Sequence, residues 1–372
     1  MSNPYLLLTP GPLSTSDSVK QTMLRDWCTW DDDYNLGVVQ PIRQQLVALA
    51  QCDASEYTSV LMQGSGSFAV ESAIGTLLPR ENGDNKAGKL LVLVNGAYGQ
   101  RIAQIAKYLN IVTVTIEAAE HEWVSTEALR QALAQDRDIT HVAMVHCETT
   151  SGILNPIEHY AGVVKDAGRT LIVDAMSSFG GMAIDVAELN IDCIISSANK
   201  CIQGVPGMGF VVVKAALLQQ CQGNARSLSL DLYDQWQTME QGNGKWRFTS
   251  PTHVVRAFQQ ALKELHQEGG ISARAQRYRD NHQTLVRGMK QLGFECVVDD
   301  EKQSPFITTF KYPKSDQFDF KTLYDRLKTA GFVIYPGKVT DTPCFRIGHI
   351  GEVYPHDMEN LLTALADNLF WK

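Results

Sequence analysis

The sequence predicts an α/β protein, with a large domain on a mainly parallel seven-stranded sheet and a smaller C-terminal α+β domain. First, short apolar runs rich in β-branched residues recur up to residue 213, which suits strands buried on both faces. Second, amphipathic stretches separate these runs, and such alternation favours a parallel sheet covered by helices. Third, the alternation ends at about residue 250, which indicates a separate C-terminal unit.

Seven predicted strands make up the large domain. They cover residues 57–62, 89–94, 111–116, 141–146, 170–175, 193–196 and 209–213. Between them, QRIAQIAKYL (100–109) and STEALRQALAQ (125–135) have the apolar spacing of amphipathic helices. We therefore expect the large domain to span residues 21–269, after an N-terminal arm of residues 1–20.

The C-terminal unit opens with a different pattern. Residues 252–268 place apolar side chains on one helical face, and Gly269 and Gly270 end that helix. A second long helix follows, and then short apolar runs alternate with two more helical stretches: the runs are 294–300, 306–312, 332–337 and 344–348, and the helices are 318–330 and 354–368. These elements predict a small α+β domain over residues 270–372.

Composition excludes several classes of protein. The formal net charge of -8 over 372 residues gives no general attraction to nucleic acid or to an anionic membrane, so an anionic ligand must be bound by local basic groups. No segment approaches the roughly 20 consecutive apolar residues of a membrane span, and no leader peptide is expected. The eight cysteines show no spacing typical of a zinc site or a disulfide framework, which favours reduced thiols in a cytoplasmic protein.

The stretch QGSGSFAVESA after the first predicted strand resembles a dinucleotide fingerprint. Gly64, Gly66 and Ala69 match its G-x-G-x-x-A form. The fingerprint also needs an acidic residue at the end of the following strand, about 20 positions on. Glu81 and Asp84 lie in a polar loop before that strand instead, which weakens a nicotinamide interpretation.

The same turn still predicts an anion site. Ser65, Gly66 and Ser67 lie where a strand ends and a helix begins, so free N–H groups and the helix dipole face the turn. A phosphate monoester fits this site as well as a pyrophosphate does. The alternative is a tight turn without a ligand.

Three further strand ends carry polar or aromatic groups. Tyr98 in NGAYGQR can lie flat against a ring or pack beneath a loop, and Thr149 in HCETTSG offers a hydroxyl that a turn cap would also explain. Asp174 directly follows an apolar strand and needs a partner, either a helix N-terminus or a cationic ring nitrogen.

Lys200 completes the set. It follows the strand at 193–196 and the small residues Ser197, Ala198 and Asn199, and a glycine-rich turn comes after it. Ligands of open α/β sheets bind at the carboxyl ends of the strands. An anion site, a flat aromatic ring, an acid and an amine together suit pyridoxal 5'-phosphate, which a lysine binds as a Schiff base with an Asp at its pyridinium nitrogen.

With these residues in place, the chain resembles a known family over essentially its whole length. The motifs YLLLTPGPL, DWCTWDDDYN, NGAYGQR, HCETTSGILNP, ISSANKCIQGVPG and CFRIGHIGEVY resemble those of the 2-aminoethylphosphonate–pyruvate aminotransferases. These are fold-type-I pyridoxal phosphate enzymes related to the alanine–glyoxylate aminotransferases. Ser151 stands where the family pattern suggests Thr, which is a mild departure.

The resemblance implies roles for individual residues around the cofactor. Lys200 matches the Schiff-base lysine, which would also move the substrate proton, and Asp174 matches the partner of the pyridine nitrogen. Tyr98 matches the aromatic that stacks on the ring, and Thr149 matches a hydroxyl near it. The resemblance also implies that 2-aminoethylphosphonate and pyruvate are the substrates and that phosphonoacetaldehyde and L-alanine are the products.

Phosphate binding and subunit contacts follow from the same resemblance. Ser65, Gly66 and Ser67 match the phosphate-binding turn, and Asn199 matches a further phosphate contact. Thr249 matches a threonine that reaches the cofactor phosphate of the neighbouring subunit, which implies a homodimer with shared active sites.

For the substrate, Arg346 matches the arginine that binds a carboxylate. A guanidinium can pair with a carboxylate or a phosphonate, although a structural ion pair would also explain this arginine. Other phosphonate contacts stay open, with Arg25, Lys245 and Arg247 as candidates. Within the run 26–35, the two tryptophans either line the substrate pocket or pack against the other subunit.

Three other functions compete with transamination. A desulfurase on the same fold needs a mobile, reactive cysteine, and Cys201 beside the lysine is badly placed for that role. A regulator that binds the cofactor without turnover would need a further binding domain, and the chain has no DNA-binding extension. The third is a nicotinamide oxidoreductase, and it rests on the incomplete fingerprint.

Overall fold

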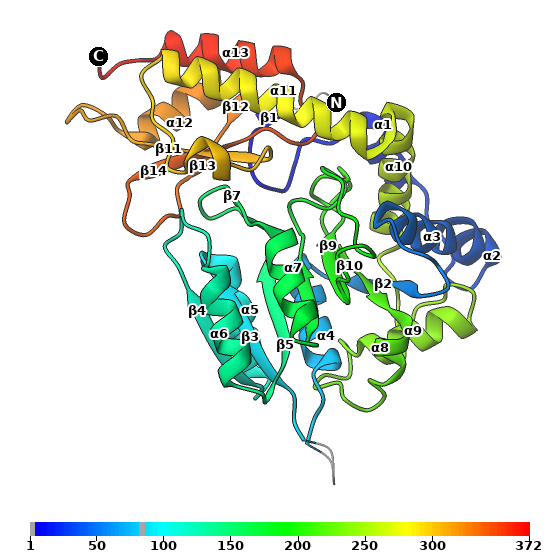
Figure 1. The fold of residues 1–372 in the computed structure, drawn as a ribbon. Coiled ribbons are helices and arrows are strands. Elements are labelled where there is room, and N and C mark those ends of the chain that lie inside the picture. Colours follow the sequence, from blue (N-terminus) through cyan, green and yellow to red (C-terminus); the bar gives the residue numbers. More distant parts are fainter. Residues whose placement is uncertain (1–3, 82–85) are drawn as a thin grey trace.

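The computed structural model describes residues 4–81 and 86–372, so Asp84 lies outside the described residues. A seven-stranded sheet forms the centre of the large domain, in the order β2-β10-β9-β8-β5-β3-β4 (Figure 1). The bounds of its strands are β2 Tyr57–Gln63, β3 Lys89–Val94, β4 Val112–Glu117, β5 Ile139–Val145, β8 Thr170–Asp174, β9 Cys193–Ser197 and β10 Met208–Lys214. Among the described residues no helix is both long and apolar enough to cross a membrane.

Strand direction places the ends of six strands at one edge of this sheet. β9, β8, β5, β3 and β4 pair in parallel. β10 is antiparallel to both β9 and β2, so β2 runs in the same direction as β9. The residues that follow β2, β3, β5, β8 and β9 therefore meet along a single edge.

All seven predicted strands are present, and the mainly parallel sheet is confirmed. The expectation that each strand is buried on both faces is wrong for one of them. β4 is one of the two edge strands, and Val112 keeps 58% of its surface exposed. Its alternating Val and Thr residues already carried a weaker apolar signal than the Leu- and Val-rich run of β3.

Helices cover both faces of the sheet. α4 (Gly66–Leu77) and α5 (Ala97–Tyr108) pack together behind it in Figure 1, and α6 (Thr126–Gln135) and α7 (Ile157–Asp166) pack together in front. The remaining elements of this part lie along its flank or in loops: α1 Asp17–Gln21, the 3₁₀ turn Thr22–Leu24, α2 Asp32–Tyr34, the π turn Asn35–Val39, α3 Gln40–Leu49, β6 Cys147–Glu148, β7 Ile153–Leu154, α8 Ala215–Gln219 and α9 Leu232–Gln241.

Two long helices connect the large domain to the C-terminal unit. α10 (Thr252–Glu268) ends at Gly269, whose φ of 111° suits a left-handed helix cap, and α11 (Gly270–Gln291) starts at the next residue. The elements that follow are the 3₁₀ turn Asp300–Lys302, β11 Ile307–Lys311, α12 Phe320–Thr329, β12 Phe332–Val333, β13 Tyr335–Pro336, β14 Cys344–Gly348 and α13 Pro355–Ala366. The run 294–300 forms no strand of its own, because only Cys296 bridges to Phe310.

Two separate apolar clusters underlie the two parts of the chain. One runs from Val19 to Leu265 and surrounds the large sheet, and the other joins Leu8 to side chains between Leu285 and Trp371. The division into domains at residue 270 stays a prediction. Leu8 belongs to the second cluster because β1 (Leu6–Leu7) pairs in parallel with β12, so the N-terminal segment joins the C-terminal part.

Candidate active site

A cavity of about 240 Å³ opens at the carboxyl edge of the sheet. Eight of the ten site residues predicted from the sequence line it: Ser65, Gly66, Ser67, Tyr98, Thr149, Asp174, Asn199 and Lys200. They come from five different strand ends, which the parallel order of the sheet brings together. Thr249 and Arg346 are not among its lining residues.

The turn before α4 forms one end of the cavity. Gly64 has a φ of 110°, which favours glycine, and Ser65 then caps α4 without a side-chain hydrogen bond to the helix. The first N–H groups of a helix have no partner inside it, so those of Gly66 and Ser67 can bind an anion. Arg101 adds a positive charge, because its guanidinium donates to Ser67 Oγ at 3.3 Å.

Asp174 lies at the end of β8 and is buried. One of its oxygens accepts the N–H of Met176 at 2.9 Å. Burial raises the pKa of Asp174 to about 6, against the smaller opposing effect of that hydrogen bond. A cation beside this carboxyl would therefore be favourable, since it would stabilise the ionised form.

Lys200 lies in the loop after β9, and its side chain lines the cavity. Its Nζ donates to the carbonyl of Pro10 at 2.5 Å. Burial lowers the pKa of Lys200, and the nearby Asp174 opposes this effect. Gly11 allows the close approach of the N-terminal segment, because a Cβ there would lie 2.7 Å from Nζ.

The buried carboxyl group of Glu148 fixes two other walls of the cavity. It accepts the N–H groups of Tyr98 and Gly99 at the start of α5, at 3.0 and 3.2 Å, and both the N–H and the hydroxyl of Thr150. Burial raises the pKa of Glu148. Sequence reasoning missed this residue, although it stands within HCETTSG next to Thr149.

Arg346 lies on β14 and is buried near the cavity. Its Nε donates to the carbonyl of Pro336 at 3.0 Å, and Nη1 donates to the carbonyl of Thr149 at 2.8 Å. No carboxylate among the described residues pairs with it, so the alternative of a structural ion pair finds no support. The two carbonyl groups hold the guanidinium in a fixed orientation.

Thr249 lies in a different pocket, together with the half-exposed rings of Phe68 and Phe248. Phe68 belongs to the first turn of α4, so this pocket adjoins the anion-binding turn. Within one chain, Thr249 does not reach the cavity.

Two basic residues near the cavity were not singled out from the sequence. Arg101 follows Tyr98 by three positions, and this spacing on α5 was the signal that both share one helical face. Lys338 stands in VIYPGKV, directly after the apolar run 332–337, and its Nζ lies 4.7 Å from the centre of the Tyr98 ring.

The other proposed phosphonate contacts lie elsewhere in the chain. Arg25 pairs with Asp33, and Arg247 pairs with Asp234. Lys245 lies 4.1 Å from the centre of the exposed Trp30 ring. None of these residues lines the cavity, and neither do Trp27 or Trp30.

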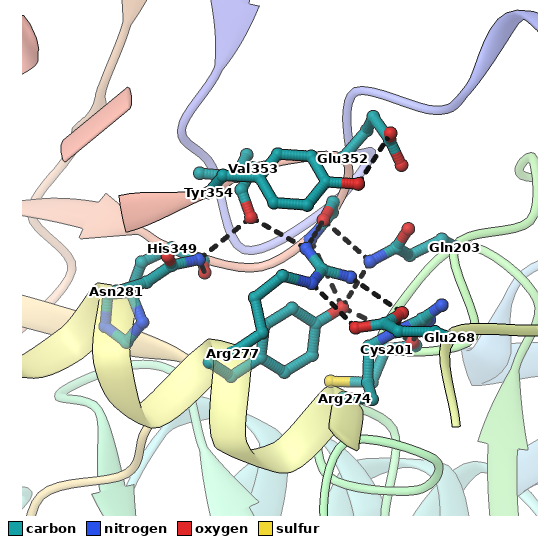
Figure 2. A network of polar contacts seen from close by, with 12 residues as sticks. Cys201, Gln203, Glu268, Arg274, Arg277, Asn281, His349, Glu352, Val353 and Tyr354 are labelled. Atoms are coloured by element: carbon teal, nitrogen blue, oxygen red, sulfur yellow. Dashed lines mark hydrogen bonds and ion pairs between the residues drawn. The ribbon is translucent and has the colours of Figure 1, made fainter. Parts of the chain in front are cut away.

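Behind the cavity, the loop that carries Lys200 is held by a dense polar network (Figure 2). Arg274 on α11 donates to the carbonyl of Cys201 at 2.7 Å, and it shares the carboxylate of Glu268 with Arg277. Arg277 also donates to the carbonyls of Gly351 and Val353. The network thus ties the lysine loop to the C-terminal part of the chain.

Gln203 makes the second connection. Its amide donates to Tyr278 Oη and to the carbonyl of Gly351, each at 2.6 Å, although its own φ of 68° is uncommon for a residue other than glycine. Asn281, one turn along α11 from Arg277, donates to the carbonyls of His349 and Val353 at 3.0 Å (Figure 2). The carbonyl of Cys201 and the amide NH2 group of Gln203, on this side of the loop, therefore have protein partners.

Comparison with known proteins gives consistent matches over the whole chain. The sequence model of the family Aminotransferase class-V matches residues 38–348. A 2-aminoethylphosphonate–pyruvate transaminase of Vibrio vulnificus (strain CMCP6) is 60% identical over 372 residues, covering 100% of both chains. A protein of the same name from Bacteroides fragilis (strain YCH46) is 57% identical over 364 residues, covering 98% of this chain and 99% of the relative.

Two solved structures share the fold. Pyridoxamine–pyruvate aminotransferase from Mesorhizobium loti superposes with a TM-score of 0.87 at 24% identity, covering 98% of this chain and 92% of the other. Alanine–glyoxylate aminotransferase from Nostoc sp. gives a TM-score of 0.88, also at 24% identity, covering 99% and 96%.

Proposed function

The chain belongs to the class-V aminotransferase family and has its fold-type-I architecture, and we propose that it transfers the amino group of 2-aminoethylphosphonate to pyruvate. The products are phosphonoacetaldehyde and L-alanine, and the cofactor is pyridoxal 5'-phosphate, on which this family depends. The observation that carries the proposal is that one cavity holds the amine of Lys200, the buried carboxyl of Asp174 and the open N-terminus of α4.

The residues present fit this cofactor. The turn at Ser65 to Ser67, with Arg101, offers donors and positive charge for a phosphate. Asp174 has a raised pKa and no cationic partner in hydrogen-bond range among the described residues, so a protonated ring nitrogen would satisfy it. Tyr98 and Thr149 would hold the ring between these two ends.

When bound, pyridoxal phosphate would supply an electron sink conjugated to the amine-bearing carbon of the substrate. Asp174, ionised beside the ring nitrogen, would keep that nitrogen protonated. The lowered pKa of Lys200 leaves a larger fraction of its amine unprotonated near neutral pH than an ordinary lysine has. Its Nζ can therefore accept a proton from the amine-bearing carbon of the substrate and donate it to C4′ of the cofactor.

Arg346 would bind the anionic end of the substrate. Its Nε and Nη1 are held by backbone carbonyls, and Nη2 has no hydrogen bond to any described residue. A guanidinium so oriented can accept the carboxylate of pyruvate in one half-reaction and the phosphonate in the other.

A homodimer and a cytoplasmic location belong to the same proposal. The exposed rings of Phe68 and Phe248 adjoin Thr249, so a second copy of the chain that covers them would bring Thr249 to the phosphate turn of its neighbour. The described cysteines are all free thiols, which fits a reducing compartment.

A desulfurase is less compatible with the structure. Cys201 is buried, its Sγ contacts the carbonyl of Ser177 at 3.2 Å, and burial raises the pKa of its thiol. A reactive cysteine needs exposure and a lowered pKa.

The deciding experiment uses the purified protein with added cofactor. Incubation with 2-aminoethylphosphonate and pyruvate should form L-alanine and phosphonoacetaldehyde in equal amounts, and Lys200→Ala should form neither. The wild-type protein should also show a visible absorption band that borohydride abolishes and that the variant lacks. If the wild-type protein forms no alanine, the proposal is wrong.

A further inference from the structure

Two basic side chains lie beside the Tyr98 ring, which lines the cavity, and a third, Arg346, contacts the carbonyl of Thr149 in another wall of it. The guanidinium carbon of Arg101 lies 4.9 Å from the centre of the Tyr98 ring, and Nζ of Lys338 lies 4.7 Å from it. Burial, and then the charges of Arg101 and Arg346, lower the pKa of Lys338, so each of these two guanidinium groups lies within electrostatic range of the lysine. We call Arg101, Lys338 and Arg346 the cation cluster.

The cation cluster has no direct carboxylate partner in the part of the chain that the structure describes, although the net charge of the whole chain is -8. Two glutamates do lie within electrostatic range of Lys338. Glu148 is buried among four donors and has a raised pKa, and Glu120 accepts the N–H of Thr340 at 2.7 Å. A group of cations without a direct carboxylate partner at a cavity predicts an anionic ligand.

The three cations divide between two elements. Arg101 stands on α5 and contacts Ser67, so it belongs to the turn that we assign to the cofactor phosphate. Lys338 and Arg346 both belong to the β13–β14 hairpin, in which Tyr335 pairs with Arg346 and Gly337 donates to the carbonyl of Cys344. The hairpin therefore presents two cations to whatever lies beside the cofactor.

The tip of this hairpin is anchored to the large domain. Glu120, in the loop between β4 and α6, accepts both the N–H and the hydroxyl of Thr340, two residues after Lys338. Lys338 itself is exposed at the rim, so its ammonium is free to turn toward a bound ligand. The backbone at Lys338 is therefore held in place, while the lysine side chain can still change its conformation.

The two substrates of the proposed reaction differ in charge. A carboxylate carries one negative charge on two oxygens, which the single guanidinium of Arg346 can neutralise in a bidentate pair. A phosphonate has three oxygens and can carry two negative charges, one more than a carboxylate. A second cation is therefore needed for the phosphonate and not for the carboxylate.

We propose that Lys338 determines specificity for the phosphonate substrate, by binding the phosphonate oxygens that Arg346 leaves unpaired. This inference rests on the proposed function, since it assigns the two half-reactions to one site. Arg346 serves both substrates, and Lys338 serves only the doubly charged one.

The test separates the two half-reactions. Lys338→Gln should raise the KM for 2-aminoethylphosphonate at least tenfold, whereas the KM for L-alanine in the reverse half-reaction should change less than about twofold. Lys338→Arg, which keeps the charge, should restore most of the affinity for the phosphonate. Lys321→Gln is the matched control, because it removes one lysine charge from the exposed face of α12, where Lys321 pairs with Asp325.

Direct binding gives a readout that does not depend on turnover. Calorimetric titration of the cofactor-loaded protein with ethylphosphonate and with propionate compares the two anionic groups without a reacting amine. Lys338→Gln should weaken ethylphosphonate binding about tenfold and leave propionate binding unchanged, while Lys321→Gln should change neither.

The outcomes distinguish the two proposals. Equal losses for both anions, or an unchanged affinity for ethylphosphonate, would overturn the role of Lys338 and leave the transaminase function in place. If 2-aminoethylphosphonate does not aminate the cofactor bound to the wild-type protein, the proposed function itself is wrong, and the role of Lys338 that rests on it is wrong as well. Unchanged thermal unfolding of the variants would exclude a general loss of structure.

Discussion

Asn199 and Lys200 belong to the same loop as the three residues that follow, but the two halves of the loop face different surroundings. On the cavity side, Lys200 Nζ contacts only the carbonyl of Pro10 among the described residues, and its pKa is lowered by burial. On the opposite side, the carbonyl of Cys201 accepts from both Arg274 and Tyr278, and the amide of Gln203 has two partners.

This difference distinguishes the side of the loop that can bind a ligand from the side that holds the loop in place. On the network side, the carbonyl of Cys201 and the amide of Gln203 are paired with protein groups, so they hold the loop in place and have little capacity for a ligand. Polar groups on the cavity side are buried with fewer partners, which is costly unless a ligand supplies the missing ones. Substitutions on the cavity side should therefore reduce activity with little loss of stability, whereas substitutions on the network side should mainly reduce stability.

The largest effect is expected on the cavity side. Lys200→Ala should reduce transamination at least about 10³-fold, because it removes both the covalent anchor and the proton-transfer group. The free energy of unfolding of the cofactor-free protein should change by less than about 1 kcal/mol, since the lost amine was buried with one partner. Single-turnover absorbance measurements and urea unfolding check the two parts. A large loss of stability would contradict the contrast between the sides.

The second largest effect is expected from a substitution on the network side of the loop. Arg274→Leu should lower the free energy of unfolding by about 3–5 kcal/mol, because it breaks a buried ion pair and removes a donor from Cys201. The surviving folded protein should still form the visible absorption band, since Lys200 and Asp174 are intact. Arg279→Leu, which removes an exposed arginine of the same helix, is the control. Equal stability of the two variants would show that the network does not hold the loop.

The third prediction concerns the cavity side again, where the effect of Asp174 on stability should depend on pH. Burial raises the folded pKa of Asp174 to about 6 from its ordinary value of 3.8. Its contribution to stability is fully present below pH 3.8 and is lost as the pH rises through about 6. Above that pH, cofactor-free Asp174→Asn should be more stable than the wild type by on the order of 2–3 kcal/mol, and the difference should shrink toward pH 4.

Urea unfolding of both proteins at several pH values tests this prediction. Addition of cofactor should reverse the order, because the wild-type carboxylate then gains a cationic partner. A stability difference independent of pH would count against a raised pKa at Asp174.

The smallest effect tests redundancy within the network. Gln203→Met removes two hydrogen bonds, but Gly351 keeps Arg277 as a donor and Tyr278 can still donate to Cys201. We expect a loss of only about 1–2 kcal/mol in the free energy of unfolding, with unchanged kcat. Thermal unfolding and steady-state kinetics measure both. A loss as large as that of Arg274→Leu would mean that Gln203 alone holds the loop.

Much of the sheet and the cavity follows from local sequence patterns. Apolar runs identify strands by their own composition, and parallel order then brings Asp174 and Lys200 to one edge whatever the details of packing. The weaker apolar pattern of β4 hinted at its exposure, but its place at an edge depends on the order of the strands in the sheet, which local composition does not determine.

Other features of the site depend on contacts between distant segments. Lys338, which was missed, reaches Tyr98 only because the β13–β14 hairpin docks against the large domain, and the same docking brings the predicted Arg346 to the carbonyl of Thr149. Glu148 carries no sequence signal of its four donors, since these arise from the fold of two separate loops. Thr249 cannot be tested in a single chain, because its expected ligand belongs to a neighbouring subunit.

The N-terminal segment has a consequence for the order of synthesis. β1 (Leu6–Leu7) is synthesised long before its partner β12 (Phe332–Val333), and Pro10, whose carbonyl accepts from Lys200 Nζ, lies three residues after β1. The wall of the cavity around the lysine should therefore close only after β12 has been made. Nascent chains that lack residues beyond 331 should fail to retain the cofactor, even though all seven strands of the large sheet have already been made.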